Sequence, residues 1–147
     1  MRVEEIVEID RPLEEVFPYV TNPENLPEWS SLVLEVRKES EGDLREGYRF
    51  TTAAKFLGRR FETPFEVSDH EPDRRHSDTS RGGPFEQEYT YTLEETGGGG
   101  TRLTWVAEAE PGGFFRLVGP LLERAGRRQF RADLQNLKDL LETEADT

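Results

Sequence analysis

Hydrophobic and polar residues alternate through most of the first 110 positions, which is typical of strands that bury one face. Glycine, proline or acidic residues separate most of these runs and mark turns. The predicted strands are 3–9, 32–39, 48–56, 60–70, 74–81, 85–94 and 101–110. Gly97–Gly100 predicts a hairpin loop between the last two strands, and Pro64 predicts a bulge or an edge position inside its own strand.

Helical spacing replaces this alternation after the first strand. Apolar residues over positions 12–20 predict a short amphipathic helix. Asp10 is placed to cap this helix and Pro12 fits its first turn, whereas Pro18 is expected to kink or shorten it. A second short turn or helix is expected over residues 22–29.

The chain beyond Pro111 has the pattern of one long amphipathic helix. Its apolar face consists of Phe114, Leu117, Val118, Leu121, Leu122, Ala125, Phe130, Leu134, Leu137 and Leu141. Pro120 and Gly126 are expected to break or bend this helix, and residues 142–147 to fray. The order of elements indicates a single α+β domain over residues 1–147, in which one antiparallel sheet carries its helices on one face.

Composition narrows the possible partners. The 31 acidic and 19 basic residues give a net charge of −12, which argues against nucleic acid and against anionic membranes. The absence of cysteine excludes disulfides, thiolate zinc sites and cysteine nucleophiles. No histidine–carboxylate spacing indicates a metal site, and no cofactor is expected. Without a signal-peptide or membrane-spanning pattern, we expect a cytoplasmic protein, either monomeric or homodimeric.

Several short segments, in order over nearly the whole chain, carry a family resemblance. They are Val7–Ile9, Arg11–Phe17, Asn22–Trp29, Gly47–Phe50, Val67–Pro72 and Gly100–Trp105. In these segments the chain resembles the START-like superfamily, which includes polyketide cyclase/dehydrase proteins, coenzyme Q-binding proteins and the birch pollen allergen type. The resemblance implies a helix-grip fold, in which a curved seven-stranded antiparallel sheet surrounds the C-terminal helix and leaves a deep cavity. Members bind lipids, sterols, quinones, polyketides or plant hormones, and some are cyclases or dehydratases, so the fold alone does not decide the function.

Large side chains of inward parity are candidates for the walls of such a cavity. From the sheet these are Phe50, Thr52, Phe65, Tyr89, Tyr91 and Trp105. From the helical segments they are Phe17, Trp29, Leu117, Leu121 and Leu122. Aromatic walls with a few hydroxyls suit a flat apolar ligand, although the same residues could instead pack a dry core.

Few polar residues are candidates for chemistry. Either His70 or His76 could act as a general base, although solvent-exposed loop histidines are the commoner explanation. His76 and Asp78 share one strand face and would form a base with its orienting carboxylate. Arg81 is expected at the cavity mouth, where it would pair with an acidic group of a ligand or simply remain exposed. The outward carboxylates by parity are Glu86, Glu88, Glu108 and Glu110.

Three functions are compatible with these features. The first is a binding or carrier protein for a small hydrophobic ligand such as a lipid, a quinone or a polyketide-like aromatic. The second is a cyclase or dehydratase that works without a metal or nucleotide cofactor. The third is an interaction module that uses the acidic surface. An inward titratable group such as His76 or Asp78 would favour the enzyme, whereas a small cavity and an exposed apolar patch would favour the interaction module.

Overall fold

The computed structural model describes residues 2–56, 58–83, 86–110 and 119–144, although the side chains of 56, 119–123 and 144 are outside that description. The strands in this part of the chain are β1 (Arg2–Ile9), β2 (Val33–Lys38), β3 (Arg49–Phe56), β4 (Arg59–Glu71), β5 (Arg75–Ser80), β6 (Glu86–Glu95) and β7 (Thr101–Glu110). The helices are α1 (Leu13–Thr21), the 3-10 turn η1 (Pro23–Asn25), α2 (Leu26–Trp29) and α4 (Gly119–Glu144). The predicted elements and their order are confirmed within a few residues, except that the predicted helical residues Phe114, Leu117 and Val118 lie outside the described residues.

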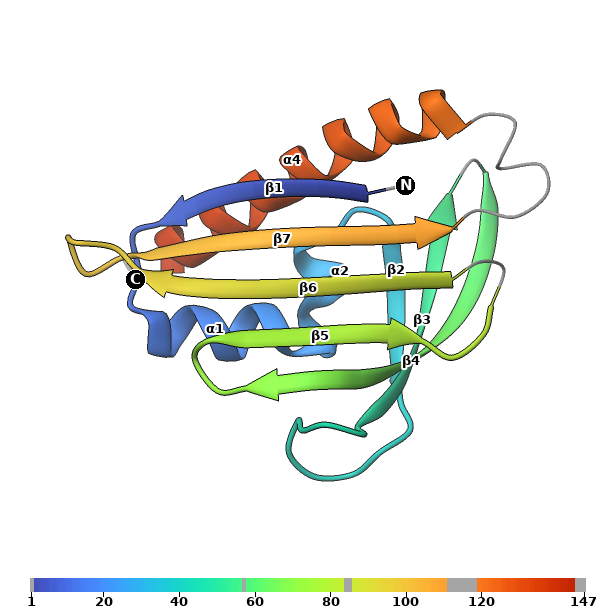
Figure 1. Ribbon diagram of the computed structural model, residues 1–147, viewed down its shortest axis with the longest axis horizontal. Coiled ribbons are helices and arrows are strands. Elements are labelled where there is room, and N and C mark those ends of the chain that lie inside the picture. The colour runs from blue at the N-terminus through green and yellow to red at the C-terminus, as the bar shows by residue number, and fades with distance from the viewer. Residues whose placement is uncertain (1, 57, 84–85, 111–118, 145–147) are drawn as a thin grey trace.

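The strands form one antiparallel sheet in the order β1-β7-β6-β5-β4-β3-β2. From β2 to β7, each strand pairs with the next strand in the sequence. The first strand, β1, pairs with the last strand, β7, and forms one edge of the sheet. The sheet is curved: β5, β6 and β7 run across Figure 1, whereas β2 and β3 run nearly upright. All the labelled helices lie behind the sheet in this view, and α4 runs beside β1. This arrangement is the α+β helix-grip fold that the resemblance implied.

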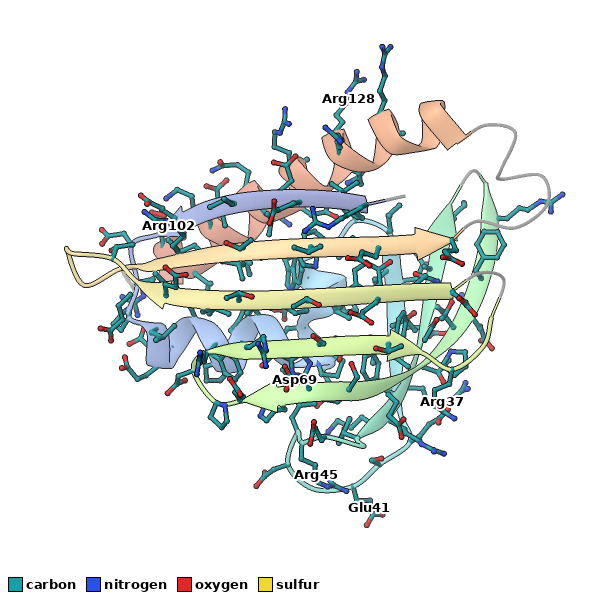
Figure 2. All side chains as sticks on the ribbon, in the orientation of Figure 1. Arg37, Glu41, Arg45, Asp69, Arg102 and Arg128 are labelled. Atoms are coloured by element: carbon teal, nitrogen blue, oxygen red, sulfur yellow. The ribbon has the colours of Figure 1, made fainter. Side chains whose placement is uncertain are left out.

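The outer face of the sheet and the exposed side of α4 carry the charges. Figure 2 shows Asp69 and Arg102 on the strands and Arg128 extending from α4 away from the sheet. Asp69 forms an ion pair with Arg75, and Arg102 pairs with Glu8 across the β1–β7 edge at 3.0 Å. Exposed pairs of this kind contribute little to stability, so the surface charge mainly keeps the outer face in water.

The core lies between the sheet and its helices. One cluster joins α1, α2 and the C-terminal half of α4, where Trp29 and Leu137 are fully buried. A second cluster on β3 and β4 contains Tyr48, Phe50, Phe65 and Val67. These residues have the parity that the alternating pattern predicted for the buried face.

Pro64 does not mark an edge, and the bulge lies elsewhere. Strand β4 runs between β3 and β5, but the β5 ladder ends at Ser80, opposite Phe65. The carbonyl of Pro64 accepts the backbone N–H of Arg81 beyond that end, at 2.8 Å. Since the N–H and C=O of one residue point to the same side of an antiparallel strand, the missing N–H of Pro64 costs no bond within that ladder. The edge interpretation of Pro64 is therefore wrong.

The predictions for the beginning and the interior of α1 were only partly right. Asp10 does not cap α1: Pro12 occupies the N-cap position and no side chain bonds the first turn. Pro18 does not end the helix either, because Val16 and Val20 on the same helix are fully buried against the core. Burial of the apolar face therefore outweighs the cost of a proline inside a short helix.

The long helix is more regular than its sequence suggests. Pro120 lies in its first turn, where backbone N–H groups have no partner within the helix, so the proline costs little there. Gly126 is accommodated at a cost of about 1 kcal/mol relative to alanine. α4 continues to Glu144, and residues 145–147 of the segment that was expected to fray lie outside the described residues. Buried Leu141 and the 2.8 Å ion pair between Lys138 and Glu142 hold this end.

Leu137→Ala tests whether this half of α4 anchors the fold. Leu137 is fully buried, so we expect the free energy of unfolding to fall by about 2–5 kcal/mol in urea denaturation. The matched control is Gln135→Ala on the exposed side of the same helix, which should change stability by less than about 0.5 kcal/mol. Equal effects of the two substitutions would contradict this role of α4.

Candidate functional site

A cavity of about 340 Å³ lies between the N-terminal half of α4 and the inner face of the sheet. The space is left open because residues with small side chains face it from both the sheet and the helix. Ala107 and Ala109 face it from β7, and Ala125 and Gly126 face it from α4. At the C-terminal half of α4 the corresponding space is filled by buried leucines. The volume is in the usual range for small-molecule sites.

A continuous band of aromatic rings forms the sheet side of this cavity. Phe50 stacks on Phe65 with ring centroids 5.5 Å apart, and Phe65 contacts Tyr89 at 5.9 Å. Tyr89 and Tyr91 stack on Trp105 at 6.2 and 6.1 Å. All five residues line the cavity. Such a surface favours flat apolar molecules, because ring faces can stack on it.

Polar groups are sparse on this wall. The described polar residues that line the cavity are Ser30, Thr52, Lys55, Thr63, Asp78, Gln87, Tyr89, Tyr91, Glu108 and Gln129. The Tyr89 hydroxyl donates to Oε1 of Gln87 at 2.7 Å. Asp78 is only 6% exposed, and it lines the cavity opposite Tyr89 in the β5–β6 ladder.

Two histidines stand behind this carboxylate. Nε2 of His76 lies 2.8 Å from Oδ1 of Asp78, and Nδ1 of His76 lies 2.9 Å from Nδ1 of His70. With both rings neutral, His76 donates from Nε2 to Asp78 and His70 donates from Nδ1 to His76, so each hydrogen bond contains one proton. His76 is fully buried and is not among the lining residues, whereas Asp78 is. The carboxylate therefore contacts the cavity, and the histidine orients it.

A β-bulge brings His70 to the inner face. The register between β4 and β5 shifts between Val67 and Asp69, which leaves Ser68 as an extra residue. An extra residue reverses the parity of the positions that follow it. His70 therefore faces the same side as Val67 and lies opposite His76 in the ladder.

Burial changes the pKa values of several groups in this region. Burial, and to a smaller extent the charge of His76, lowers the pKa of His70. Burial also raises the pKa of Tyr89 to about 12, with a further contribution from the negative charge of Asp78. The pKa of Tyr91 is raised for the same two reasons. Both phenols consequently remain protonated and can donate hydrogen bonds at neutral pH.

The structure brings together all six sheet residues that the pattern selected. Phe50, Thr52, Phe65, Tyr89, Tyr91 and Trp105 line the cavity. Phe17 and Trp29 lie instead in the packed core, where the ring of Phe17 contacts His70 at 5.6 Å and Trp29 contacts Trp105 at 5.4 Å. Leu117 lies outside the described residues. Leu121 and Leu122 lie on α4, but their side chains are outside the description.

The expectations for Arg81, Glu108 and the histidines need correction. The guanidinium of Arg81 pairs with Glu39 at 3.0 Å and does not line the cavity. The Thr51 hydroxyl, and then Arg81, lower the pKa of this glutamate. Glu108 was assigned to the outer face but also borders the cavity, near the end of β7. Both histidines lie in strands and are buried or half-buried, so the interpretation as exposed loop residues is wrong.

Some lining residues were not selected from the sequence. They include Phe61, Thr63, Gln87, Ala107, Gln129 and Phe130. Gln87 shares the parity of Tyr89 and could have been found by that signal. The alanines could not be assigned by size alone, because a small residue can face either a cavity or a closely packed neighbour.

An antiparallel sheet that grips a C-terminal helix and encloses a ligand-sized cavity defines a helix-grip protein of the START-like superfamily. Within this class, the family model described as "Polyketide cyclase / dehydrase and lipid transport" matches residues 1–142, and the chain belongs to that family. This family suggests that the chain binds a small hydrophobic ligand. None of the curated proteins compared with the chain matches it.

Solved structures share the whole fold at low sequence identity. Protein TTHA0849 of Thermus thermophilus is 20% identical, with 95% of each chain covered and a TM-score of 0.81. A START superfamily protein of Mycobacterium smegmatis is 16% identical over 99% of this chain and 97% of the other, with a TM-score of 0.71. The di-domain ARO/CYC protein BexL, from the BE-7585A biosynthetic pathway, is 19% identical over 97% of this chain and 46% of its own, with a TM-score of 0.74.

The helices also bear on the expectation about membranes. α4 is 26 residues long but carries many charged residues along its length. Within residues 2–56, 58–83, 86–110 and 119–144, no helix combines the length and the apolar character needed to cross a bilayer.

The titration of the two lining tyrosines tests the electrostatics of the site. In NMR titrations with ring-labelled tyrosine, we expect Tyr89 to titrate near pH 12 and Tyr91 also well above 10. Asp78→Asn should lower both pKa values, because it removes a nearby negative charge that disfavours the phenolate. Glu88→Gln on the outer face is the control and should leave them unchanged. Titration of both tyrosines near pH 10 would contradict this description.

Proposed function

We propose that this protein binds and carries a small, flat, largely apolar molecule in the cavity between α4 and the sheet. The observation that carries the proposal is the space of about 340 Å³ with a wall of five aromatic side chains. A dry core would instead fill this space, because protein interiors pack at the density of organic crystals. The family match supports the same conclusion at the level of ligand class.

The residues that line the cavity indicate the chemical class of the ligand more closely. Stacked rings at 5.5–6.2 Å line one side of the cavity, so a ring system of the quinone or polyketide-like kind fits better than a long acyl chain. Most of the lining surface is apolar, although ten polar residues contribute to it, which favours a ligand with few polar substituents.

An interaction module is less well supported. It requires a contiguous exposed apolar patch. Among the described residues, the exposed large hydrophobic side chains are Ile6 and Leu34. They lie on β1 and β2, the two opposite edges of the sheet, and so do not form one surface.

A second candidate function is an enzyme of the cyclase or dehydratase type. It is favoured by Asp78, a titratable group that reaches the cavity and is oriented by His76. In this case Asp78 would exchange protons with the substrate, and His76 would position it. We expect Asp78→Asn to reduce turnover of a poly-keto substrate by about 100-fold or more while the ligand is still bound. Unchanged turnover would exclude Asp78 as the acid or base.

Ligand retention is the direct test of the carrier proposal. Native mass spectrometry and solvent extraction of freshly purified protein should show an apolar molecule of defined mass. Ala107→Trp fills the cavity from β7 and should weaken retention at least about tenfold, because 1.4 kcal/mol of lost contact suffices for that change.

The matched control is Thr104→Trp, which adds the same side chain to the other face of β7. This variant should retain the ligand. Equal retention by both variants, or the absence of any bound molecule together with no affinity for flat aromatic compounds, would contradict the carrier function.

A further inference from the structure

We propose that the ligand of this cavity carries a protonated amine, which pairs with Asp78 while its ring system stacks on the aromatic wall. This inference rests on the proposed function, since it concerns the chemistry of a molecule held in the same cavity. The juxtaposition that carries it is a buried carboxylate that lines the same cavity as the five aromatic rings described above and lies opposite Tyr89 in the β5–β6 ladder.

The carboxylate is poorly compensated by the protein. Within the described part of the chain, the hydrogen bond to the Asp78 carboxyl comes from Nε2 of His76, at 2.8 Å, and binds Oδ1. A carboxylate that is removed from water needs several donors or an opposite charge. That hydrogen bond leaves Oδ2 unused, and Oδ2 is not one of the fully buried atoms without a partner among the described residues, so it is open to the cavity that Asp78 borders. The missing partner therefore has room on the cavity side.

The nearby histidines need not supply the opposite charge. Burial lowers the pKa of His70, and the charge of His76 lowers it further whenever that ring is protonated, so His70 does not supply the opposite charge at neutral pH. With His76 neutral as well, every hydrogen bond in the line His70–His76–Asp78 contains one proton. The three side chains then carry one net negative charge, which an ammonium group in the cavity would balance.

The surrounding rings also suit a cation. The faces of tryptophan, tyrosine and phenylalanine attract an ammonium group placed within about 6 Å of the ring centre. Tyr89 lies opposite Asp78 in the β5–β6 ladder, and its phenol stays protonated, so it adds no competing charge. The net charge of −12 attracts cations to the molecule as a whole. An anionic ligand would instead meet this carboxylate, and Arg81 does not compensate it because it pairs with Glu39, which leaves Lys55 as the cationic side chain among the described lining residues.

Three molecules of the same shape separate the amine from the ring system. They are 2-aminotetralin, 2-tetralol and tetralin, which place an ammonium, a hydroxyl and a hydrogen on one bicyclic frame. Their affinities for the full chain would be measured by isothermal titration calorimetry after resident ligand has been extracted. We expect the amine to bind at least about tenfold more tightly than the alcohol, and tetralin to bind measurably.

Substitution of Asp78 tests whether the amine of the ligand binds to this carboxylate. Asp78→Asn keeps the shape of the side chain and should abolish the preference for the amine, while tetralin affinity changes less than about threefold. Asp78→Ser is a second variant in case the amide is poorly tolerated, and tetralin binding reports that the pocket is intact in either. Glu88→Gln is the control, because it removes one negative charge from the outer face of the neighbouring strand β6.

Each outcome is decisive. Equal affinity of the wild-type chain for amine and alcohol would overturn the proposal, and would mean that His76 already balances the carboxylate. A preference that survives in Asp78→Asn and Asp78→Ser would overturn the assignment to Asp78. If none of the three compounds binds although the purified protein retains an apolar molecule, the amine-bearing ring is wrong and the carrier function stands. If nothing is bound or retained, the proposed function itself fails.

Discussion

The packing of α4 against the curved sheet is the constraint on which the rest of the structure depends. The C-terminal half of this helix is held by Leu134, Leu137 and Leu141, which are buried in the cluster that also contains Trp29 and Trp105. A straight helix cannot remain in contact with a curved sheet along its whole length. Its N-terminal half therefore stands over a space that small residues on both sides do not fill.

The contact between Trp105 and Phe130 marks the transition between the two regions. The ring centroids of this pair are 4.6 Å apart, the shortest ring contact among the described residues. On one side of it lies the leucine core, and on the other lies the cavity. The C-terminal half of α4 thus stabilises the fold, whereas described residues of its N-terminal half line the cavity.

A row of hydrogen-bonded polar side chains buried in an apolar core lowers the stability of the fold relative to apolar packing, so its presence suggests a function. His70, His76 and Asp78 are joined by two hydrogen bonds, and replacing them with apolar residues would often be neutral or stabilising. The line ends at the cavity wall rather than at a backbone partner. This placement is the reason to assign the group to ligand recognition or proton exchange rather than to packing.

The sequence by itself determined the element order, the α+β class and the parity that turns Phe50, Tyr91 and Trp105 toward one side, because alternation and helical spacing are local properties of the chain. It also carried the family resemblance. Local pattern could not show that β1 pairs with β7, or that Pro64 lies where the β5 ladder has ended, because both depend on which strands meet.

The site itself was decided by the tertiary structure. One extra residue in β4 places His70 opposite His76, and parity counted from the sequence would have turned it outward. Asp78 contacts the cavity and His76 stands behind it, the reverse of the roles that spacing suggested. Whether inward aromatic residues surround a space or fill it depends on the distance between α4 and the sheet, which only long-range packing sets.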